Sequence, residues 1–138
     1  MCIRDRFTPL QKAPTWAAAS EEMKEQQNAA VLEFLDVWRG HWEKKDLDSM
    51  KDLYLESFPD RENYFATKQK NLDSYRSVSV DLDEVQIRRS GVYWTITAKQ
   101  RFTSESYGDF GEKTLMLVST SQGFRVVQER WEKLDENS

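Results

Sequence analysis

The amino-acid sequence predicts an α+β fold in which three helices precede a four-stranded antiparallel sheet. Two observations support this fold class. Upstream of residue 77 the chain is rich in Ala, Glu, Gln, Lys and Leu, and its apolar residues recur at three- and four-residue spacing, as in helices. Downstream, apolar and polar residues alternate with a period of two, which is typical of half-buried strands. Helices followed by strands indicate helices packed on one face of an antiparallel sheet.

The composition is that of one globular domain. The chain has 138 residues, of which 38% are hydrophobic and 32% charged. A net charge of -4 and a pI near 5.1 argue against nucleic-acid binding, because no Lys/Arg cluster outweighs the acids. No window approaches the roughly 20 apolar residues of a membrane span, and no secretory apolar region is present.

The first residues look foreign to the domain. MCIRDR, residues 1–6, matches the translation of a transposase sequencing adapter, which would make the chain a fragment of a longer protein; a native start is the alternative. Residues 7–14 contain two prolines and are expected to be a linker. The domain is expected over 15–134, with a frayed tail at 135–138. Cys2, the only cysteine, cannot form an internal disulfide.

The first helix is expected to start at Thr15 or Ser20, where residues that favour helices become frequent. Gly40 interrupts it near its end, at a cost of about 1 kcal/mol relative to Ala. Its buried face is expected to consist of apolar residues at helical spacing, namely Val31, Phe34, Leu35, Trp38 and Trp42.

Two shorter helices are expected to follow. Asp46 can cap the second, because its carboxylate can accept hydrogen bonds from free backbone N–H groups. Pro59 ends that helix, since proline lacks a donor, and Asp60 can cap the third. The expected inner faces are Met50, Leu53, Tyr54 and Ser57 in the second helix, and Tyr64, Phe65, Lys68 and Leu72 in the third.

Four strands are expected in the order of a meander. In Ser77–Arg89 the apolar residues shift from even to odd positions across Asp83 and Glu84, which predicts a bulge or a bend. Ser90 and Gly91 are expected to form the hairpin to the second strand. The chain then turns through YGDFGE, returns as KTLMLVSTS, turns at SQG and returns as FRVVQERWE. The inner face of the second strand is expected to be Val92, Trp94, Ile96, Ala98, Gln100 and Phe102.

Gln100 is the one amide on this apolar face. A buried amide must find partners, or leave polar groups unsatisfied at about 1–3 kcal/mol. It can bond to Tyr54, Tyr64 or a neighbouring backbone group, or it can contact a ligand, and pockets of this kind are mostly apolar with a few polar groups. The aromatic residues nearby can likewise form core or line a cleft. The candidate pocket residues are Gln100, Trp38, Trp42, Tyr54, Tyr64, Trp94, Phe102 and Tyr107.

An acid–base active site is not expected. His41, the only histidine, follows Trp38 by three residues and can serve as a boundary histidine or as a general base. No carboxylate is expected on the sheet face that carries Trp94, since Asp81 and Asp83 fall on the opposite face. Neither metal-ligand spacing nor a phosphate-binding loop is present, so no metal and no cofactor are expected.

Two further pairs of polar residues have simple structural interpretations. Lys113 and Glu129 are expected to form a cross-strand ion pair, and binding of a carboxylate or sugar polymer is the alternative. Tyr107 and Asp109 are expected in the turn between two strands, where turn chemistry explains Asp109 and Tyr107 can lie at the rim of a cavity or an interface.

The strand region AKQRFTSESYGDFGEKTLMLVSTSQGFRVVQE is similar to the pattern F-x-Q-x-Y-x-S-x-x-Y-x-D-x-x-x-K-x-L-x-L, followed by aromatic-x-I/V-x-x-E. With two tryptophans on the first helix and KKDLDSM at the start of the second, the chain resembles the NTF2-like (SnoaL-like) superfamily from about Val31 to Glu132. Within it, the chain is most similar to the NTF2-like domain appended to L,D-transpeptidase-type peptidoglycan enzymes. Phe102 and Phe124 stand where Tyr and Trp are usual. The matched positions are Gln100, Ser104, Tyr107, Asp109, Lys113, Leu115, Leu117, Phe124, Val126 and Glu129.

The resemblance implies a cone in which a curved sheet wraps three helices and leaves a cavity at its open end. It also implies an accessory, non-catalytic domain of a larger bacterial envelope protein, in the periplasm or cell envelope, with an upstream catalytic domain. Such a domain would bind a small ligand or peptide, or position a peptidoglycan-processing partner. The alternatives are a free-standing SnoaL-like isomerase or dehydratase for a small hydrophobic carbonyl compound, with His41 or Tyr64 as acid–base, and a dimerisation module. A homodimer is expected, because sheets of this superfamily pair through their outer faces.

Overall fold

The structure, a computed structural model, describes the backbone of residues 13–135 and the side chains of residues 25–135. The expectations for residues 1–12, including the adapter-like start and Cys2, lie outside the described residues. The chain divides into two units, residues 1–33 and 34–138. Helix α1 (Ala13–Glu43) starts before the predicted Thr15 or Ser20 and continues through Gly40 without a break. The second unit holds the last turns of this helix, both shorter helices and all four strands.

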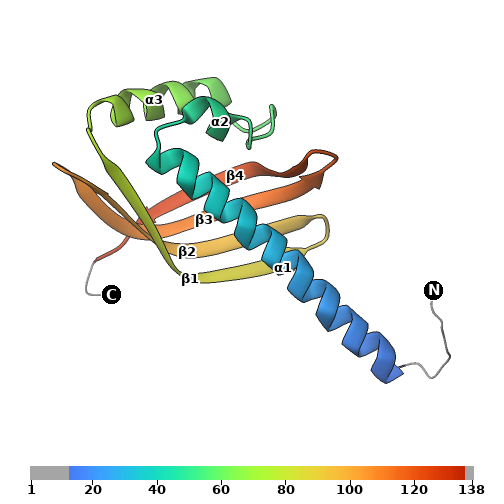
Figure 1. The fold of residues 1–138 in the computed structure, drawn as a ribbon. Helices are drawn as coiled ribbons and strands as arrows, with labels where there is room; N and C mark the ends of the chain where they lie inside the picture. The colour runs from blue at the N-terminus through green and yellow to red at the C-terminus, as the bar shows by residue number, and fades with distance from the viewer. Residues whose placement is uncertain (1–12, 136–138) are drawn as a thin grey trace. The chain divides into compact units, whose positions relative to one another are not determined.

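The four strands form one antiparallel sheet in chain order, as the sequence predicts (Figure 1). They are β1 (Val78–Ser90), β2 (Tyr93–Ser104), β3 (Gly108–Thr120) and β4 (Gly123–Lys133). The predicted bulge in the first strand is present, because the β1–β2 register shifts between Asp83 and Gln86 and Glu84 has a φ of 52°. Asp81 and Asp83 are exposed, as expected.

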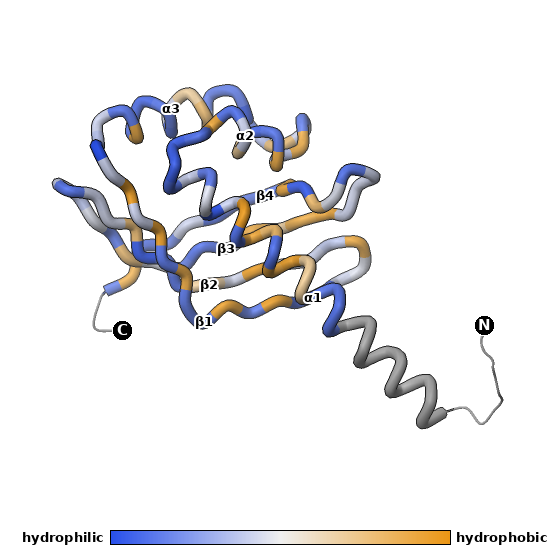
Figure 2. The backbone as a smooth tube through the Cα atoms, viewed as in Figure 1, coloured by the Kyte–Doolittle hydropathy of each residue, from blue (hydrophilic) through white to orange (hydrophobic). Residues whose placement is uncertain are grey.

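The last turns of α1, together with α2 (Leu47–Lys51) and α3 (Arg61–Asp73), lie on one face of this sheet (Figure 1). This arrangement confirms the predicted α+β fold. Helix α3 is largely hydrophilic (Figure 2), and only Phe65 and Leu72 are buried in it. The core between the helices and the sheet contains Leu35, Trp38, Trp42, Met50, Trp94, Ile96, Phe102, Leu115, Leu117 and Val126.

The second helix is shorter than predicted. Asp46 caps it as expected, since its Oδ1 accepts a hydrogen bond of 3.3 Å from the Ser49 backbone N–H. The helix nevertheless ends at Lys51, because the segment after it pairs with the edge of β4: Val126 N donates to Leu53 O at 2.8 Å. Ser57 is therefore exposed, whereas Tyr54 is buried.

Three other local predictions were wrong. Asp60 precedes α3 in a left-handed conformation with a φ of 55°, and its side chain makes no capping hydrogen bond to the described backbone. All of the predicted turn YGDFGE except Tyr107 instead forms the start of β3. The real turn is tighter and closes where Ser104 N donates to Tyr107 O at 2.7 Å. Asp109 therefore pairs with Phe102 inside the sheet, and Val92 lies exposed at the preceding hairpin rather than facing inward.

None of the described helices is both long and apolar enough to cross a membrane.

Candidate ligand-binding site

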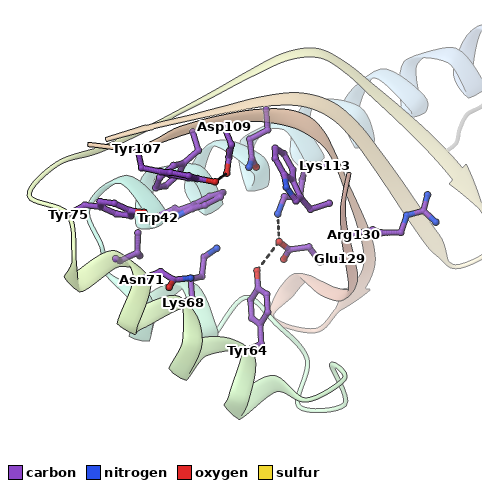
Figure 3. A pocket seen from close by; sticks show the side chains of 14 residues that line it. Trp42, Tyr64, Lys68, Asn71, Tyr75, Tyr107, Asp109, Lys113, Glu129 and Arg130 are labelled. Atoms are coloured by element: carbon purple, nitrogen blue, oxygen red, sulfur yellow. Dashed lines mark hydrogen bonds and ion pairs between the residues drawn. The ribbon is translucent and has the colours of Figure 1, made fainter. Parts of the chain in front are cut away.

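A cavity of about 460 Å³ lies between α3, the end of α1 and the inner face of β2, β3 and β4 (Figure 3). Its walls combine aromatic rings with charged and amide groups, which is typical of small-molecule sites. The side chain of Arg130 points away from the other labelled groups (Figure 3) and is exposed. The lining residues are Trp42, Tyr64, Lys68, Asn71, Leu72, Tyr75, Gln100, Phe102, Tyr107, Asp109, Lys113, Glu129, Arg130 and Trp131.

A buried carboxylate, Glu129 on β4, organises one side of this cavity. Lys113 Nζ donates to Glu129 Oε2, and the two side chains are only 8% and 5% exposed. Tyr64 OH donates to Glu129 Oε2 at 2.8 Å, and Tyr54 OH donates to Oε1. Trp38 Nε1 in turn donates to Tyr54 OH at 2.9 Å. Side chains from β3, α3 and the loop after α2 thus converge on one carboxylate, and Trp38 of α1 supports it through Tyr54.

These contacts fix the protonation states of the network. Burial acts to raise the pKa of Glu129, but the charges of Lys113 and Lys68 and the hydrogen bonds from Lys113 and Tyr54 bring it down to about 2. Burial, with the nearby Glu129 charge, raises the pKa values of Tyr54 and Tyr64 well above their ordinary value. Glu129 is therefore ionised and both tyrosines are neutral near pH 7, which suits none of them to general acid–base catalysis.

Lys68 on α3 is a second cation in the cavity, and its surroundings are different. Its Nζ lies 3.8 Å from the centroid of the Trp42 ring and 5.4 Å from that of Tyr64. Among the residues that the structure describes, it donates no hydrogen bond and forms no ion pair. Burial lowers its pKa to about 8, although the charges of Glu129 and Asp109 oppose this shift. Its ammonium group is thus available to a ligand.

Two acceptor oxygens on the opposite wall also lack partners within the described part of the chain. Gln100 on β2 is 3% exposed, and its Oε1 accepts no hydrogen bond there. Asp109 on β3 accepts from Tyr107 OH at Oδ2, at 2.9 Å, but its buried Oδ1 has no partner among the described residues. Asp109 pairs with Phe102 and Gln100 with Gly111, so the two groups lie on neighbouring strands one pleat apart. Buried oxygens of this kind are normally paired.

Gly111 makes room for one aromatic wall. A Cβ at this position would lie 2.7 Å from the Trp131 ring and 2.3 Å from the Glu132 carbonyl oxygen. Only glycine therefore allows the Trp131 indole to lie across β3. Lys113 Nζ is 5.7 Å from the centroid of that ring.

The cavity contains five of the eight residues named from the sequence as pocket candidates, namely Gln100, Trp42, Tyr64, Phe102 and Tyr107. Trp38 and Tyr54 are buried beneath it, where they support Glu129. Trp94 packs elsewhere, with its ring centroid 5.0 Å from that of Phe124. His41 is half-exposed and is not among the residues that line the cavity.

The expectation that the inner sheet face carries no acid was wrong. A register shift between Met116 and Leu117 leaves Val127 unpaired, so that Val126 and Glu129 both point inward. The predicted Lys113–Glu129 ion pair is present, but it is buried in the cavity wall. Strict alternation could not reveal this, because one extra residue reverses the faces of the strand.

Lys68 was not among the site residues predicted from the sequence. A signal for it was present: Lys68 shares the inner face of its helix with Tyr64, Phe65 and Leu72, where a lysine is unusual. Asn71, Tyr75 and Trp131 carried no such signal, because their arrangement around the cavity depends on how the helix and the sheet are placed.

Known proteins resemble the chain in sequence and fold. Residues 30–130 match the family described as the Cds6 C-terminal NTF2-like domain. Bd1075 of Bdellovibrio bacteriovorus is similar in structure, with a TM-score of 0.75 and 22% identity over 85% of this chain and 43% of that one. The helical cell shape determining protein Pgp2 of Campylobacter jejuni has a TM-score of 0.67 and 17% identity, over 75% of this chain and 40% of that one. The chain therefore spans less than half the length of either protein.

A different kind of relative is matched along nearly its whole length. A candidate scytalone dehydratase from Novosphingobium aromaticivorans has a TM-score of 0.74 and 10% identity, over 83% of this chain and 89% of that one. At these identities the structural likenesses show the fold alone. No match was found among curated proteins. The family match spans the last part of α1, both shorter helices and nearly the whole sheet, so the chain belongs to the Cds6 C-terminal NTF2-like domain family.

Proposed function

We propose that the chain is an accessory, non-catalytic domain of a larger bacterial envelope protein and that it binds a small ligand or peptide in the cavity described above. The observation that carries this proposal is the state of the polar groups in the cavity. Glu129 is held ionised by the charges of Lys113 and Lys68 and by hydrogen bonds from Lys113 and Tyr54. Within the described part of the chain, Lys68, Gln100 and Asp109 still present polar groups that have no hydrogen-bond or ion-pair partner. Such a wall is suited to holding a ligand rather than to transferring protons.

The comparisons supply the context of the proposal. The family is named for a C-terminal domain, and both Bd1075 and Pgp2 are more than twice as long as the region they share with this chain. Pgp2 is described as determining helical cell shape. A domain of this kind would position a peptidoglycan-processing partner, of the L,D-transpeptidase type that the sequence pattern suggests, by holding part of the cell wall in its pocket. The proposed location is the periplasm or cell envelope.

A second candidate function is that of a small dehydratase or isomerase. It is favoured by the near-complete overlap with the candidate scytalone dehydratase. His41, the histidine that such chemistry would use, lies outside the cavity lining, and Tyr64 is neutral and bonded to Glu129. The two residues put forward as its acid–base groups therefore do not meet at a common reaction centre.

Co-sedimentation with isolated peptidoglycan sacculi tests the binding function. The wild-type chain should pellet with the sacculi, and the double variant K113M/E129Q should stay in the supernatant. Replacing both partners avoids leaving one buried charge unpaired. K70M is the matched control, because Lys70 is exposed on the same helix. A wild-type chain that stays in the supernatant, or a double variant that pellets as well as K70M, would reject the proposal.

Incubation in D2O with small hydrophobic ketones tests the catalytic alternative. Deuterium incorporation next to the carbonyl that is lost in H41A or Y64F would establish the enzyme function in place of the binding function. Background exchange at the rate of buffer alone would exclude acid–base chemistry of this type on these substrates.

A further inference from the structure

Three polar groups that have no hydrogen-bond or ion-pair partner among the described residues lie on different elements around the same cavity. Lys68 on α3 contributes a cation, Gln100 on β2 an amide oxygen, and Asp109 on β3 a carboxylate oxygen. Of the other charged lining residues, Lys113 and Glu129 neutralise each other in an ion pair, and Arg130 points away from the cavity (Figure 3). What remains for a ligand is one positive group and two acceptors.

These groups are arranged across the cavity from one another. Figure 3 shows Asp109 on the sheet side and Lys68 on the helix side, with the Trp42 ring between them. The charge of Asp109 acts on Lys68, yet no ion pair joins the two residues. Trp42 packs on Phe102 with ring centroids 5.5 Å apart, so the surface between the two charges is aromatic. Both charged groups thus line the same cavity without pairing with each other.

The chemistry of the three groups selects the ligand. A simple anion would pair with Lys68 but would be repelled by Asp109. A neutral sugar could donate to Gln100 and Asp109 but would leave the Lys68 ammonium without a counter-charge. A ligand with a carboxylate and an ammonium group satisfies all three, because buried charges and acceptors are stable when paired.

We propose that this pocket recognises the free amino-acid end of its ligand, in which one carbon carries both an ammonium and a carboxylate group. The carboxylate pairs with Lys68, and the ammonium donates to Asp109 Oδ1 and Gln100 Oε1. The carbon that carries them lies against Trp42 and Phe102. This inference rests on the proposed ligand-binding function and names the chemical group that the site recognises.

Titration with alanine and its blocked forms, followed by NMR chemical shifts, tests this inference. The probes are D-alanine and L-alanine, N-acetylalanine, which lacks the ammonium, and alaninamide, which lacks the carboxylate. At least one enantiomer of alanine should shift resonances of the pocket residues. Each blocked form should bind that pocket about tenfold more weakly or worse, because each loses a charge-assisted contact. Blocked forms that bind as well as alanine would overturn the inference.

Variants assign each charge to its residue. K68M should weaken the binding of alanine about tenfold or more and should abolish the preference for alanine over alaninamide. D109N should likewise weaken alanine binding and should abolish the preference for alanine over N-acetylalanine. K68R should recover most of the binding, and K70M should behave as the wild type. A K68M variant that keeps the preference would overturn the assignment, provided that its NMR spectrum shows the native fold.

The two proposals fail in different ways. If the wild-type chain sediments with sacculi but does not distinguish the alanine series, the ligand-binding function stands and the amino-acid subsite is rejected. If it binds neither sacculi nor any of the four probes, both proposals are rejected.

Discussion

The hydroxyl group of Tyr54 donates a hydrogen bond to Glu129, although 75 residues separate the two in the chain. The contact ties the loop after α2 to β4, where backbone pairing between Leu53 and Val126 joins the same two segments. Trp38 completes the connection from α1. The buried carboxylate thus joins the helices to the sheet and also forms one wall of the cavity.

Removing this carboxylate should destabilise the domain. E129Q leaves Lys113 buried without a counter-charge, so we expect the free energy of unfolding to fall by about 3–5 kcal/mol in urea denaturation. E132Q is the matched control, since Glu132 is exposed on the same strand, and it should change stability by about 0.5 kcal/mol or less. Equal effects of the two variants would show that the ion pair has no structural role.

The stability of the domain should fall at low pH because of the Glu129 carboxylate. The pKa of Glu129 is about 2 in the folded chain, against an ordinary 4.5. Folding therefore favours its ionised form, and this stabilisation, about 3 kcal/mol, is present above pH 4.5 and lost as the pH falls towards 2. Urea unfolding measured between pH 7 and pH 2 should show a flatter acid dependence for E129Q than for the wild type. Parallel curves would contradict this role of Glu129.

Lys68 should be a residue whose removal stabilises the fold while weakening binding. Its pKa falls to about 8 from 10.5 because burial disfavours the charged form. The unfolded chain therefore binds the proton more tightly, and stability should rise as the pH increases from 8 to 10.5. K68M should add about 1 kcal/mol to the free energy of unfolding at pH 7 and should remove that rise. A K68M variant less stable than the wild type would show that the ammonium is already satisfied.

Ligand binding should follow the protonation of Lys68. The groups that face it are Trp42 and Tyr64, with the charges of Glu129, Lys113 and Asp109. Affinity for alanine should decrease as the pH rises through about 8, because the ammonium that pairs with the carboxylate loses its proton. In K68R the affinity should stay constant through that range, because a guanidinium remains charged. A wild-type affinity that is constant from pH 7 to 9 would exclude Lys68 as the carboxylate partner.

Replacing either of two glycines by alanine should change the stability of the domain, in opposite directions at the two positions. At Gly111 a Cβ would clash with the Trp131 ring and the Glu132 carbonyl, so G111A should lower the free energy of unfolding by about 1–3 kcal/mol and shift the Trp131 indole resonance. At Gly40 nothing lies within 4 Å of the added carbon. G40A should therefore stabilise helix α1 by about 0.5–1 kcal/mol. A G111A variant as stable as the wild type would show that Trp131 can leave the cavity wall at no cost.

The sequence by itself determined the order and type of the main elements. The alternation from Trp94 to Phe102 and the helical spacing of Leu35, Trp38 and Trp42 are local signals, because burial on one face of an element imposes its own period on the chain. The same alternation identified Gln100 as a polar residue on an apolar face, where the structure places it.

Only the tertiary structure decided which side chains form the cavity. Glu129 faces inward because of an extra residue in β4, and the helix predicted through Tyr54 ends early because that segment pairs with the edge of the sheet. Lys68 and Asp109 come from elements distant in the chain and line the same cavity only once α3 lies over the sheet. Contacts of this kind depend on register and on the placement of whole elements, and neither is encoded in the period of any single stretch of sequence.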